Sequence, residues 1–436
     1  MDGPLDPAMY DTGRPVPSWW EASAGPGIER PTLAGEHRTE VAIIGGGYTG
    51  LSAAIVLAEQ GIGCTVLDAG AIGWGSSGRN GGIVGFGGSK LSRTTMVRRY
   101  GAEETARSEE MLATSAKRIH AFCLEHGLAA DTQGDGELIL AHGDRSAREL
   151  AGNPPPSGFR TEPIAPSGRP DIARFGGVRL SPGFGIHPLR YVRALAEAAD
   201  AAGTKLHPRS EVLSWERDGN GHRLITAGGA VLADRVMLAT NGFTPDRLHP
   251  TFRARIAPVL SNIVVTRPLT ESERQAHPWL TDAPVADTRN LLAYFRCLPD
   301  GRLLFGMRGD VRGSDRAAER MHARLRRRIA RELPGVAAAE TTHFWRGPVC
   351  ANAALRPSIG RLEEEPTVFH AYGWHGSGIN MGSLAGRLTG ALVAGADPET
   401  IPAPWRGLTP RIPLPGLRPL YVGASMLAYA LADRQG

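Results

Sequence analysis

The sequence predicts an α/β protein that opens with a Rossmann-like unit and continues with a mixed α+β part. Two observations carry this expectation. An apolar run at residues 41–44 leads into G-x-G-x-x-G at residues 45–50, and a second apolar run at 65–67 ends at Asp68. A strand, a glycine turn, a helix and a second strand in this order form the dinucleotide-binding crossover. At 436 residues the chain exceeds what one hydrophobic core usually supports, so we expect one large interleaved unit or two domains.

Each glycine of the motif has a mechanical role. Gly45 permits the tight turn, Gly47 lets the backbone approach a pyrophosphate, and Gly50 lets the helix pack closely on the strand. The N-terminus of the helix, expected over residues 51–60, offers free N–H groups to the phosphates. Asp68 is placed to accept a hydrogen bond from a ribose hydroxyl. The residues expected to contact a dinucleotide here are Gly45, Gly47, Tyr48, Thr49, Gly50 and Asp68.

This motif occurs in full once, because Gly85 and Gly87 form a partial copy without a third glycine or a preceding strand. The motif does not separate NAD from FAD. One site implies one bound dinucleotide, so we expect the electrons to come from the substrate.

Composition and charge exclude several classes of protein. Lysine and arginine together number 49 against 44 acidic residues, for a net charge of +5, but only Lys90, Lys117 and Lys205 are lysines. The densest arginine run, residues 320–333, also carries apolar residues at every fourth position, which predicts an amphipathic helix with a solvated basic face. We therefore expect no nucleic-acid partner.

Cysteine usage and apolar runs bear on the compartment. No C-x-x-C pair or cluster of metal ligands is present, so we expect no metal site and a reducing, cytoplasmic location. The N-terminus has no secretory pattern, and GGGYTG interrupts the uncharged stretch 41–58, so we expect no transmembrane segment. The sequence leaves the oligomeric state open. The four cysteines are Cys64, Cys123, Cys297 and Cys350.

Several ordered blocks carry a family resemblance. After Asp68 the chain runs AGAIGWGSSGRNGGIVG, with S-G-R-N-G-G at residues 77–82. These blocks span most of residues 15–390 and resemble the D-amino acid oxidase-like superfamily of FAD oxidoreductases, more narrowly its γ-glutamylputrescine oxidase branch. The other matching blocks are PSWWEASA, HPLRYVRALAEAADAAGTKLHPRSEV, VLADRVMLATNGFTP, YFRCLPDGRLLFGMR, LRPSIGRL and GWHGSGINMGSLAG.

The resemblance implies FAD as the cofactor and adds residues to its site. Asn80 to Gly82 lack bulk where a flat ring approaches the backbone. Arg79 can serve phosphate or ribose oxygens, although a solvated arginine in a glycine loop is the alternative. The N-terminus of a helix near Gly376 can stabilise negative charge on a reduced flavin, unless it is an ordinary glycine-rich helix start. The residues implied are Ser76, Ser77, Arg79, Asn80, Gly81, Gly82, Val212, Asn241, Gly376, Ser377, Gly378 and Ile379.

The resemblance also implies the reaction. The C–N bond of a small amine or amino acid, γ-glutamylputrescine-like or N-alkyl, is expected to be oxidised by hydride transfer to flavin N5. The imine is then hydrolysed, and O2 reoxidises the flavin to give H2O2. Three alternatives stay open. They are an amine dehydrogenase or N-demethylase that uses a carrier protein or quinone, a flavoprotein accessory subunit without catalysis, and an NAD-dependent dehydrogenase.

Candidates for the substrate pocket are less sharply defined. Tyr294 and Arg296 alternate along an expected strand and so share a face, where Arg296 can bind a carboxylate or serve a structural role. Trp374 and His375 adjoin the flavin-facing turn. Asn380 stands where the related sarcosine oxidase branch has a lysine, and no lysine follows position 205, which leaves the electron acceptor open.

Three further departures from the family's pattern concern the cofactor and the substrate. Cys350 lies near, but out of register with, the cysteine that tethers FAD in the sarcosine oxidase branch, so we expect non-covalent FAD. Ile83 replaces a glutamine that often follows S-G-R-N-G-G, and NAALRP replaces a TPD-like segment. The last two changes touch the substrate side and leave the substrate unnamed.

The expected architecture interleaves two domains. A tail follows, with a short apolar helix packed on this chain or on a partner. The expected segments are an N-terminal arm at 1–35, an FAD-binding domain at 36–95, 176–245 and 345–403, a substrate domain with a mostly antiparallel sheet at 96–175 and 246–344, and the tail at 404–436.

Overall fold

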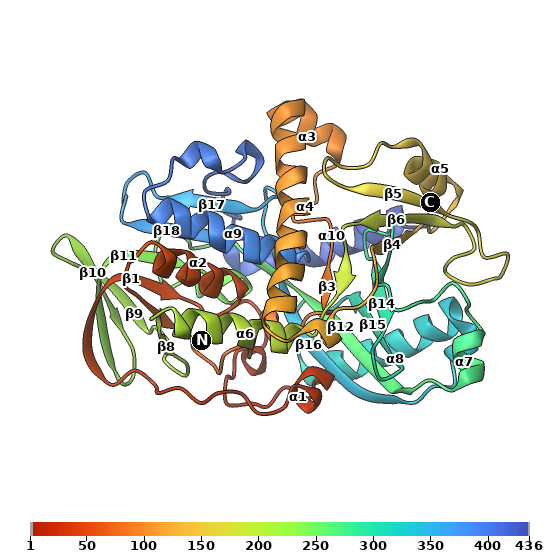
Figure 1. Cartoon of the computed structure of the whole chain (residues 1–436), viewed down its shortest axis with the longest axis horizontal. Coiled ribbons are helices and arrows are strands. Elements are labelled where there is room, and N and C mark those ends of the chain that lie inside the picture. The colour runs from red at the N-terminus through yellow and green to blue at the C-terminus, as the bar shows by residue number, and fades with distance from the viewer. Residues whose placement is uncertain (1–2, 435–436) are drawn as a thin grey trace.

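Two eight-stranded sheets organise the chain, and helices pack against both (Figure 1). This computed structural model describes residues 3–434. The long helix α4 (Ala102–Glu125) stands between the part built on the first sheet and the part built on the second (Figure 1). The expected fold class, a Rossmann-like domain interleaved with a largely antiparallel α+β part, is confirmed.

The first sheet is the Rossmann-like one, in the order β17-β18-β11-β1-β2-β8. Its β1, β2, β8, β11 and β18 run parallel, as buried apolar strands of an α/β fold do. A β9–β10 hairpin extends it through β11. The strands are β1 (Gly35–Ile44), β2 (Cys64–Leu67), β8 (Lys205–His207), β9 (Ser214–Asp218), β10 (Gly221–Ile225), β11 (Gly229–Leu238), β17 (Ser358–Arg361) and β18 (Val368–Tyr372).

Helices α2 (Tyr48–Glu59) and α9 (Gly378–Val393) pack against each other beside the first sheet (Figure 1). Glycines make the close approach possible. A Cβ at Gly386 would lie 2.2 Å from the Thr49 carbonyl oxygen, and one at Gly390 would lie 2.9 Å from that of Ala53. The contact ties together the two helices whose first residues were expected to hold the cofactor.

The second sheet has the order β16-β12-β15-β14-β13-β4-β6-β5 and is antiparallel except for the β13–β4 pair. Helix α8 (Asp315–Glu332) buries Met321, Leu325 and Ile329 against it, so the predicted amphipathic helix is confirmed. The strands are β4 (Glu137–Leu140), β5 (Arg160–Ile164), β6 (Gly177–Ser181), β12 (Ala257–Pro268), β13 (Val285–Asp287), β14 (Ala293–Cys297), β15 (Arg302–Arg308) and β16 (Thr341–Ala351).

Two expected segment boundaries differ from the pairing of the strands. β6 and β16 belong to the second sheet, although β6 and residues 345–351 of β16 fall within the segments 176–245 and 345–403 that were expected to be cofactor-binding. The reason is long-range main-chain pairing, of β6 with β4 and of β16 with β12. The remaining elements are α1 (Trp19–Ser23), β3 (Ile83–Val84), α3 (Arg93–Tyr100), α5 (Asp144–Gly152), β7 (Phe184–Gly185), α6 (Pro188–Ala201) and α7 (Glu271–Gln275).

The tail forms helix α10 (Arg418–Ala432), as expected. The Asp433 carboxylate accepts hydrogen bonds from the backbone N–H of Asn290 (2.8 Å) and Leu291 (3.0 Å), which anchors the end of the helix beside the second sheet. Leu420 and Leu427 on its outer face are more than 60% exposed. Within residues 3–434 no helix has the length and apolar character needed to cross a membrane.

Candidate active site

A cavity of about 480 Å³ lies between the two sheets. One wall comes from the glycine turn after β1 and from the loop over residues 73–90, and another from the turn before α9. The face of the second sheet that carries Ser261, Ile263 and Tyr294 closes the remaining side. The cavity therefore collects most of the residues that the sequence placed at a cofactor site.

The glycine turn has the geometry that a pyrophosphate site requires. Gly45 has φ +111°, and its Cβ would lie 2.8 Å from the Ala239 carbonyl oxygen. A Cβ at Gly50 would lie 1.9 Å from the Gly45 carbonyl oxygen, so only glycine lets α2 approach β1 this closely. Gly47 caps α2 without a side-chain hydrogen bond of its own. The Tyr48 N–H donates to Ser77 Oγ (3.2 Å), and the following N–H groups of the first turn are left for a ligand in the cavity.

Asp68 lies at the end of β2, where a ribose was expected. Its carboxylate accepts hydrogen bonds from the backbone N–H of Gly46 (2.7 Å) and Gly70 (2.8 Å). Burial raises the pKa of Asp68, and these two N–H groups oppose that rise. Val212 lines the same cavity from the connection between β8 and β9.

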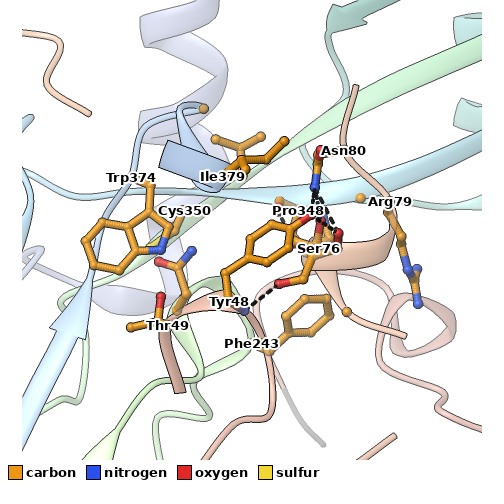
Figure 2. Close-up of a pocket in the computed structure, with 18 of the residues that line it drawn as sticks. Tyr48, Thr49, Ser76, Arg79, Asn80, Phe243, Pro348, Cys350, Trp374 and Ile379 are labelled. Atoms are coloured by element: carbon orange, nitrogen blue, oxygen red, sulfur yellow. Dashed lines mark hydrogen bonds between the residues drawn. The ribbon is translucent and has the colours of Figure 1, made fainter. Parts of the chain in front are cut away.

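A hydrogen-bond network around Asn80 shapes the S-G-R-N-G-G loop (Figure 2). The Asn80 amide donates to the Tyr48 hydroxyl (3.1 Å) and to the carbonyl oxygens of Ser76 and Ser77 (3.0 Å each). Its Oδ1 accepts from the backbone N–H of Gly82 (2.9 Å). All the hydrogen bonds of the Asn80 side chain thus stay within the protein. The loop presents its backbone to a ligand.

Arg79 and Ser76 are positioned differently from each other. The Ser76 hydroxyl donates to the Pro348 carbonyl oxygen (2.6 Å), so it serves the protein. Arg79 Nε donates to the Trp74 carbonyl oxygen (2.6 Å), and its guanidinium lies 4.1 Å from the centre of the Trp74 ring. Burial lowers the pKa of Arg79 to about 10. Its Nη2 is buried with no partner among the described residues, which suits an anionic oxygen of a ligand.

The turn before α9 is held in an unusual backbone conformation. His375 has φ +48° and Gly376 φ +112°. Arg308 Nη2 donates to the His375 carbonyl oxygen (2.6 Å) and leaves no room for a Cβ at Gly376, which would lie 2.4 Å away. Ser377 gives α9 no side-chain cap, so free N–H groups at the helix start line the cavity. Asn241, with φ +45°, supports this turn by accepting from the Gly373 N–H (2.9 Å).

The substrate-side candidates divide into two groups. Tyr294, Trp374 and His375 line the cavity, and the Tyr294 hydroxyl shares a hydrogen bond with that of Ser261 (2.8 Å). Burial lowers the pKa of His375 to about 3, so its ring is neutral at physiological pH.

Arg296 and Asn380 lie behind the cavity wall, which corrects the expectation that they face a substrate. Arg296 is 1% exposed and donates to the Ile186 carbonyl oxygen (2.5 Å) and to Gln133 (3.2 Å), because its end of β14 runs under β7. Asn380 donates to the carbonyl oxygens of Gly85 and Leu112 (3.0 Å each) and thereby joins α9 to α4. Both side chains have structural partners.

Cys350 lines the cavity, and burial raises the pKa of its thiol to about 12. A thiol with so high a pKa stays protonated and is a poor nucleophile. This environment suits the expected non-covalent cofactor.

Four charged residues of the cavity wall were not predicted from the sequence, namely Lys90, Glu137, Glu211 and Arg308. Lys90 follows the glycine-rich loop, and burial together with Arg308 lowers its pKa to about 7. Arg308 ends β15, and Glu137 begins β4. The rarity of lysine was the one signal that pointed to Lys90, whereas Glu137 and Arg308 had none. No group of three metal-ligating side chains occurs within residues 3–434.

The wall fits the flavin adenine dinucleotide that the resemblance implies. The Cβ-free turn at residues 45–50 and the unpartnered Arg79 Nη2 suit the diphosphate. The N–H groups at the start of α9 suit the pyrimidine edge of a flat ring. The residues that would hold the cofactor are Gly45, Gly47, Tyr48, Thr49, Asp68, Arg79, Gly81, Val212, Gly376, Ser377, Gly378 and Ile379.

Comparison with known proteins gives relatives that match most of the chain. Over 402 residues the chain is 31% identical to "Probable oxidoreductase OrdL" of Rhizobium meliloti (strain 1021), covering 88% of this chain and 89% of that protein. Over 437 residues it is 29% identical to "Gamma-glutamylputrescine oxidoreductase" of Escherichia coli (strain K12), covering 96% and 98%. A crystal structure of glycine oxidase from Geobacillus kaustophilus has a TM-score of 0.67 at 23% identity, covering 86% and 100%.

A family model covers the same region as the sequence blocks. The family described as DAO, FAD dependent oxidoreductase, matches residues 40–392. That span includes the glycine turn after β1, the S-G-R-N-G-G loop and the turn before α9. The chain therefore belongs to the DAO family of FAD-dependent oxidoreductases.

Proposed function

We propose that this enzyme oxidises the C–N bond of a small amine or amino acid, either a γ-glutamylputrescine-like amine or an N-alkyl amino acid. One observation carries the proposal. One cavity combines two features. The first is the set of residues that would hold the flavin, namely the glycine turn at 45–50, the loop over 73–90 and the turn at 376–379, which we call the flavin cradle. The second is a wall of the second sheet that bears both an acidic side chain, Glu137, and a basic one, Arg308. FAD supplies the hydride acceptor for this chemistry when it is bound. The oxidised substrate is an imine, which water hydrolyses to a carbonyl compound and an amine or ammonia.

The residues of the cavity supply position, dryness and electrostatics. Ile263 and Trp374 are buried apolar side chains that exclude water. Arg308 fixes the His375 carbonyl and with it the turn that aims N–H groups of α9 into the cavity. Those N–H groups stabilise negative charge on a reduced ring. The neutral His375 ring adds no positive charge that would repel a cationic amine.

O2 is the acceptor that we propose. Reduction of O2 develops negative charge, and Lys90 places a titratable amine on the cavity wall where it can stabilise that charge. A carrier protein or quinone is the second candidate. It is favoured by Asn380, whose side chain is engaged by backbone carbonyls where the sarcosine oxidase branch has a lysine.

An anaerobic screen of the FAD-loaded enzyme tests the reaction. Polyamine conjugates, N-methylated glycines and amino acids are added in turn while flavin absorbance is followed. Loss of absorbance with one of these compounds supports the proposal. Purified yellow protein that none of them bleaches would indicate an accessory flavoprotein.

Stopped-flow mixing of the reduced enzyme with O2 then identifies the acceptor. Fast reoxidation with one H2O2 per turnover supports an oxidase. Slow reoxidation that a quinone accelerates supports a dehydrogenase.

A further inference from the structure

One face of the second sheet forms the cavity wall opposite the flavin cradle. β13 pairs with β4 and β14, and β14 pairs with β15, in registers that set Ala286 beside Ile139 and Tyr294, and Tyr294 beside Gly306. Side chains alternate along a strand, so Glu137, Ala286, Tyr294 and Arg308 project from the same face. We call these four residues the substrate face, and all four line the cavity.

Glu137 is the residue of the substrate face that the protein itself leaves unsatisfied. Glu137 is 8% exposed, and within residues 3–434 its carboxylate has no hydrogen bond or ion pair. A Cβ at Gly85 would lie 2.1 Å from Glu137 Oε2, so glycine at that position makes room for the carboxyl group. The chain thus builds a dedicated space for an acid and gives it no partner.

A buried carboxylate without a partner is costly, and proteins resolve the cost in one of two ways. The group takes up a proton, and burial indeed raises the pKa of Glu137 to about 7. Alternatively, a cation enters and pairs with it. Near neutral pH the carboxyl group is present in both its protonated and its ionised form. A cationic ligand that donates N–H groups to Glu137 therefore has to shift this equilibrium only slightly toward the ionised form.

We propose that Glu137 binds the ammonium group of the substrate and selects cationic amines for this cavity. The inference rests on the proposed function and names the substrate class more closely, as an amine that arrives protonated. The ammonium group must give up one proton before hydride leaves the neighbouring carbon, and the Glu137 carboxylate with which it pairs is the group that takes that proton. No residue of the sequence motifs supplies this carboxylate, since the acid of the glycine motif, Asp68, is engaged by backbone N–H groups at the other end of the cofactor site.

The rest of the substrate face orients such a ligand. Arg308 lies on β15, three strands from Glu137 on β4. The strand registers also offset the two positions by four residues along the strand direction, so Arg308 and Glu137 lie at opposite ends of the substrate face. Arg308 and Lys90 repel an ammonium group, while Ala286 and Tyr294 between the two ends offer apolar surface for methylene groups. The ammonium group is therefore directed to the Glu137 end.

A pair of probes that differ in charge tests the proposal. The probes are 1,4-diaminobutane and its neutral counterpart 1,4-butanediol, mixed anaerobically with the FAD-loaded enzyme. Kd comes from the shift of flavin absorbance on binding or, where the probe bleaches the flavin, from the dependence of the bleaching rate on probe concentration. The variant is Glu137→Gln, which keeps the shape and removes the charge. The matched control is Glu109→Gln, a buried carboxylate outside the cavity that accepts hydrogen bonds from Arg93 (2.9 Å) and the Ser157 N–H (2.9 Å).

We expect wild type and Glu109→Gln to bind the diamine more tightly than the diol. In Glu137→Gln the Kd for the diamine should rise roughly 10- to 100-fold, the loss of one charge-assisted hydrogen bond, while that for the diol stays the same. Equal Kd values for the diamine in wild type and Glu137→Gln would overturn the proposal. So would an equal loss for both probes, which is the mark of a structural role.

Two safeguards keep the test decisive. If Glu137→Gln loses FAD or fails to fold, the wild-type comparison decides, and an absence of preference for the diamine over the diol overturns the proposal. Failure of the proposed function is distinguishable, because it would appear as a flavin that no amine bleaches, whether or not the diamine binds through Glu137.

Discussion

The contact between α2 and α9 makes a sharp prediction, because it joins the two helices whose first residues are expected to hold the cofactor. The perturbation is Gly386→Ala. A Cβ at this position would lie 2.2 Å from the Thr49 carbonyl oxygen, and an ordinary contact begins at 3.4 Å. The Thr49 carbonyl oxygen belongs to the backbone of α2 and cannot rotate away as a side chain could. The two helices must therefore separate by about 1 Å.

The expected magnitude is the balance of two terms. Alanine in place of glycine favours a helix by about 1 kcal/mol, and overpacking costs about 1–3 kcal/mol. Gly423→Ala in α10 isolates the first term, because nothing lies within 4 Å of the Cβ it would add. With an unfolding entropy of about 2.1 cal/mol/K per residue, 436 residues give about 0.9 kcal/mol/K, so each 1 kcal/mol moves Tm by about 1 °C.

The assay is thermal unfolding of both variants, with the FAD content of each purified protein measured by absorbance. Gly386→Ala should melt about 1–3 °C below Gly423→Ala and should retain less FAD, since the shift moves residues 47–49 relative to residues 376–379. Gly423→Ala should match or slightly exceed wild type in Tm. If Gly386→Ala melts as high as Gly423→Ala and keeps its full FAD content, the close helix contact does not position the cofactor site.

Three further predictions follow from the same geometry. Gly47→Leu should abolish FAD retention because a side chain there enters the turn against Ser77 Oγ, 2.7 Å from the Cβ position, whereas Gly63→Ala, whose Cβ first meets Glu40 at 3.4 Å, should purify yellow; yellow, active Gly47→Leu would contradict the placement of the pyrophosphate. Arg296→Gln should lower the free energy of unfolding by about 1–3 kcal/mol, since it leaves the Ile186 carbonyl unpaired, without changing KM for an amine; a raised KM with normal stability would restore a substrate role. For Glu137, the rise in pKa from 4.5 to about 7 means that the folded protein binds the proton more tightly than the unfolded chain, so ligand-free wild type should lose about 3 kcal/mol as pH rises from below 4.5 to above 7. Glu137→Gln should not lose this stability as pH rises. The difference in Tm between wild type and Glu137→Gln, followed from pH 5 to 8, measures the effect, and a difference that stays constant would refute a raised pKa at Glu137.

Local sequence was enough to predict the turns and helices whose shape depends on residues that are close together in the chain. The glycine spacing at residues 45–50 predicts the turn because Cβ atoms there would clash with neighbouring backbone. Likewise the four-residue apolar repeat in residues 320–333 predicts α8, because helical geometry brings such residues onto one face. The order of motif blocks also indicated the family and the cofactor, since each block keeps its own backbone shape.

Tertiary structure alone decided which polar side chains reach the cavity. Alternation along β14 correctly placed Tyr294 and Arg296 on one face, but the strand extends past the cavity, so Arg296 meets β7 and Tyr294 meets the cavity. Glu137 arrives there because Leu138 pairs with Val285, far away in the chain. Pairing between strands that are far apart in the chain depends on which faces of the sheet become buried in the folded protein. A short stretch of sequence does not carry that information.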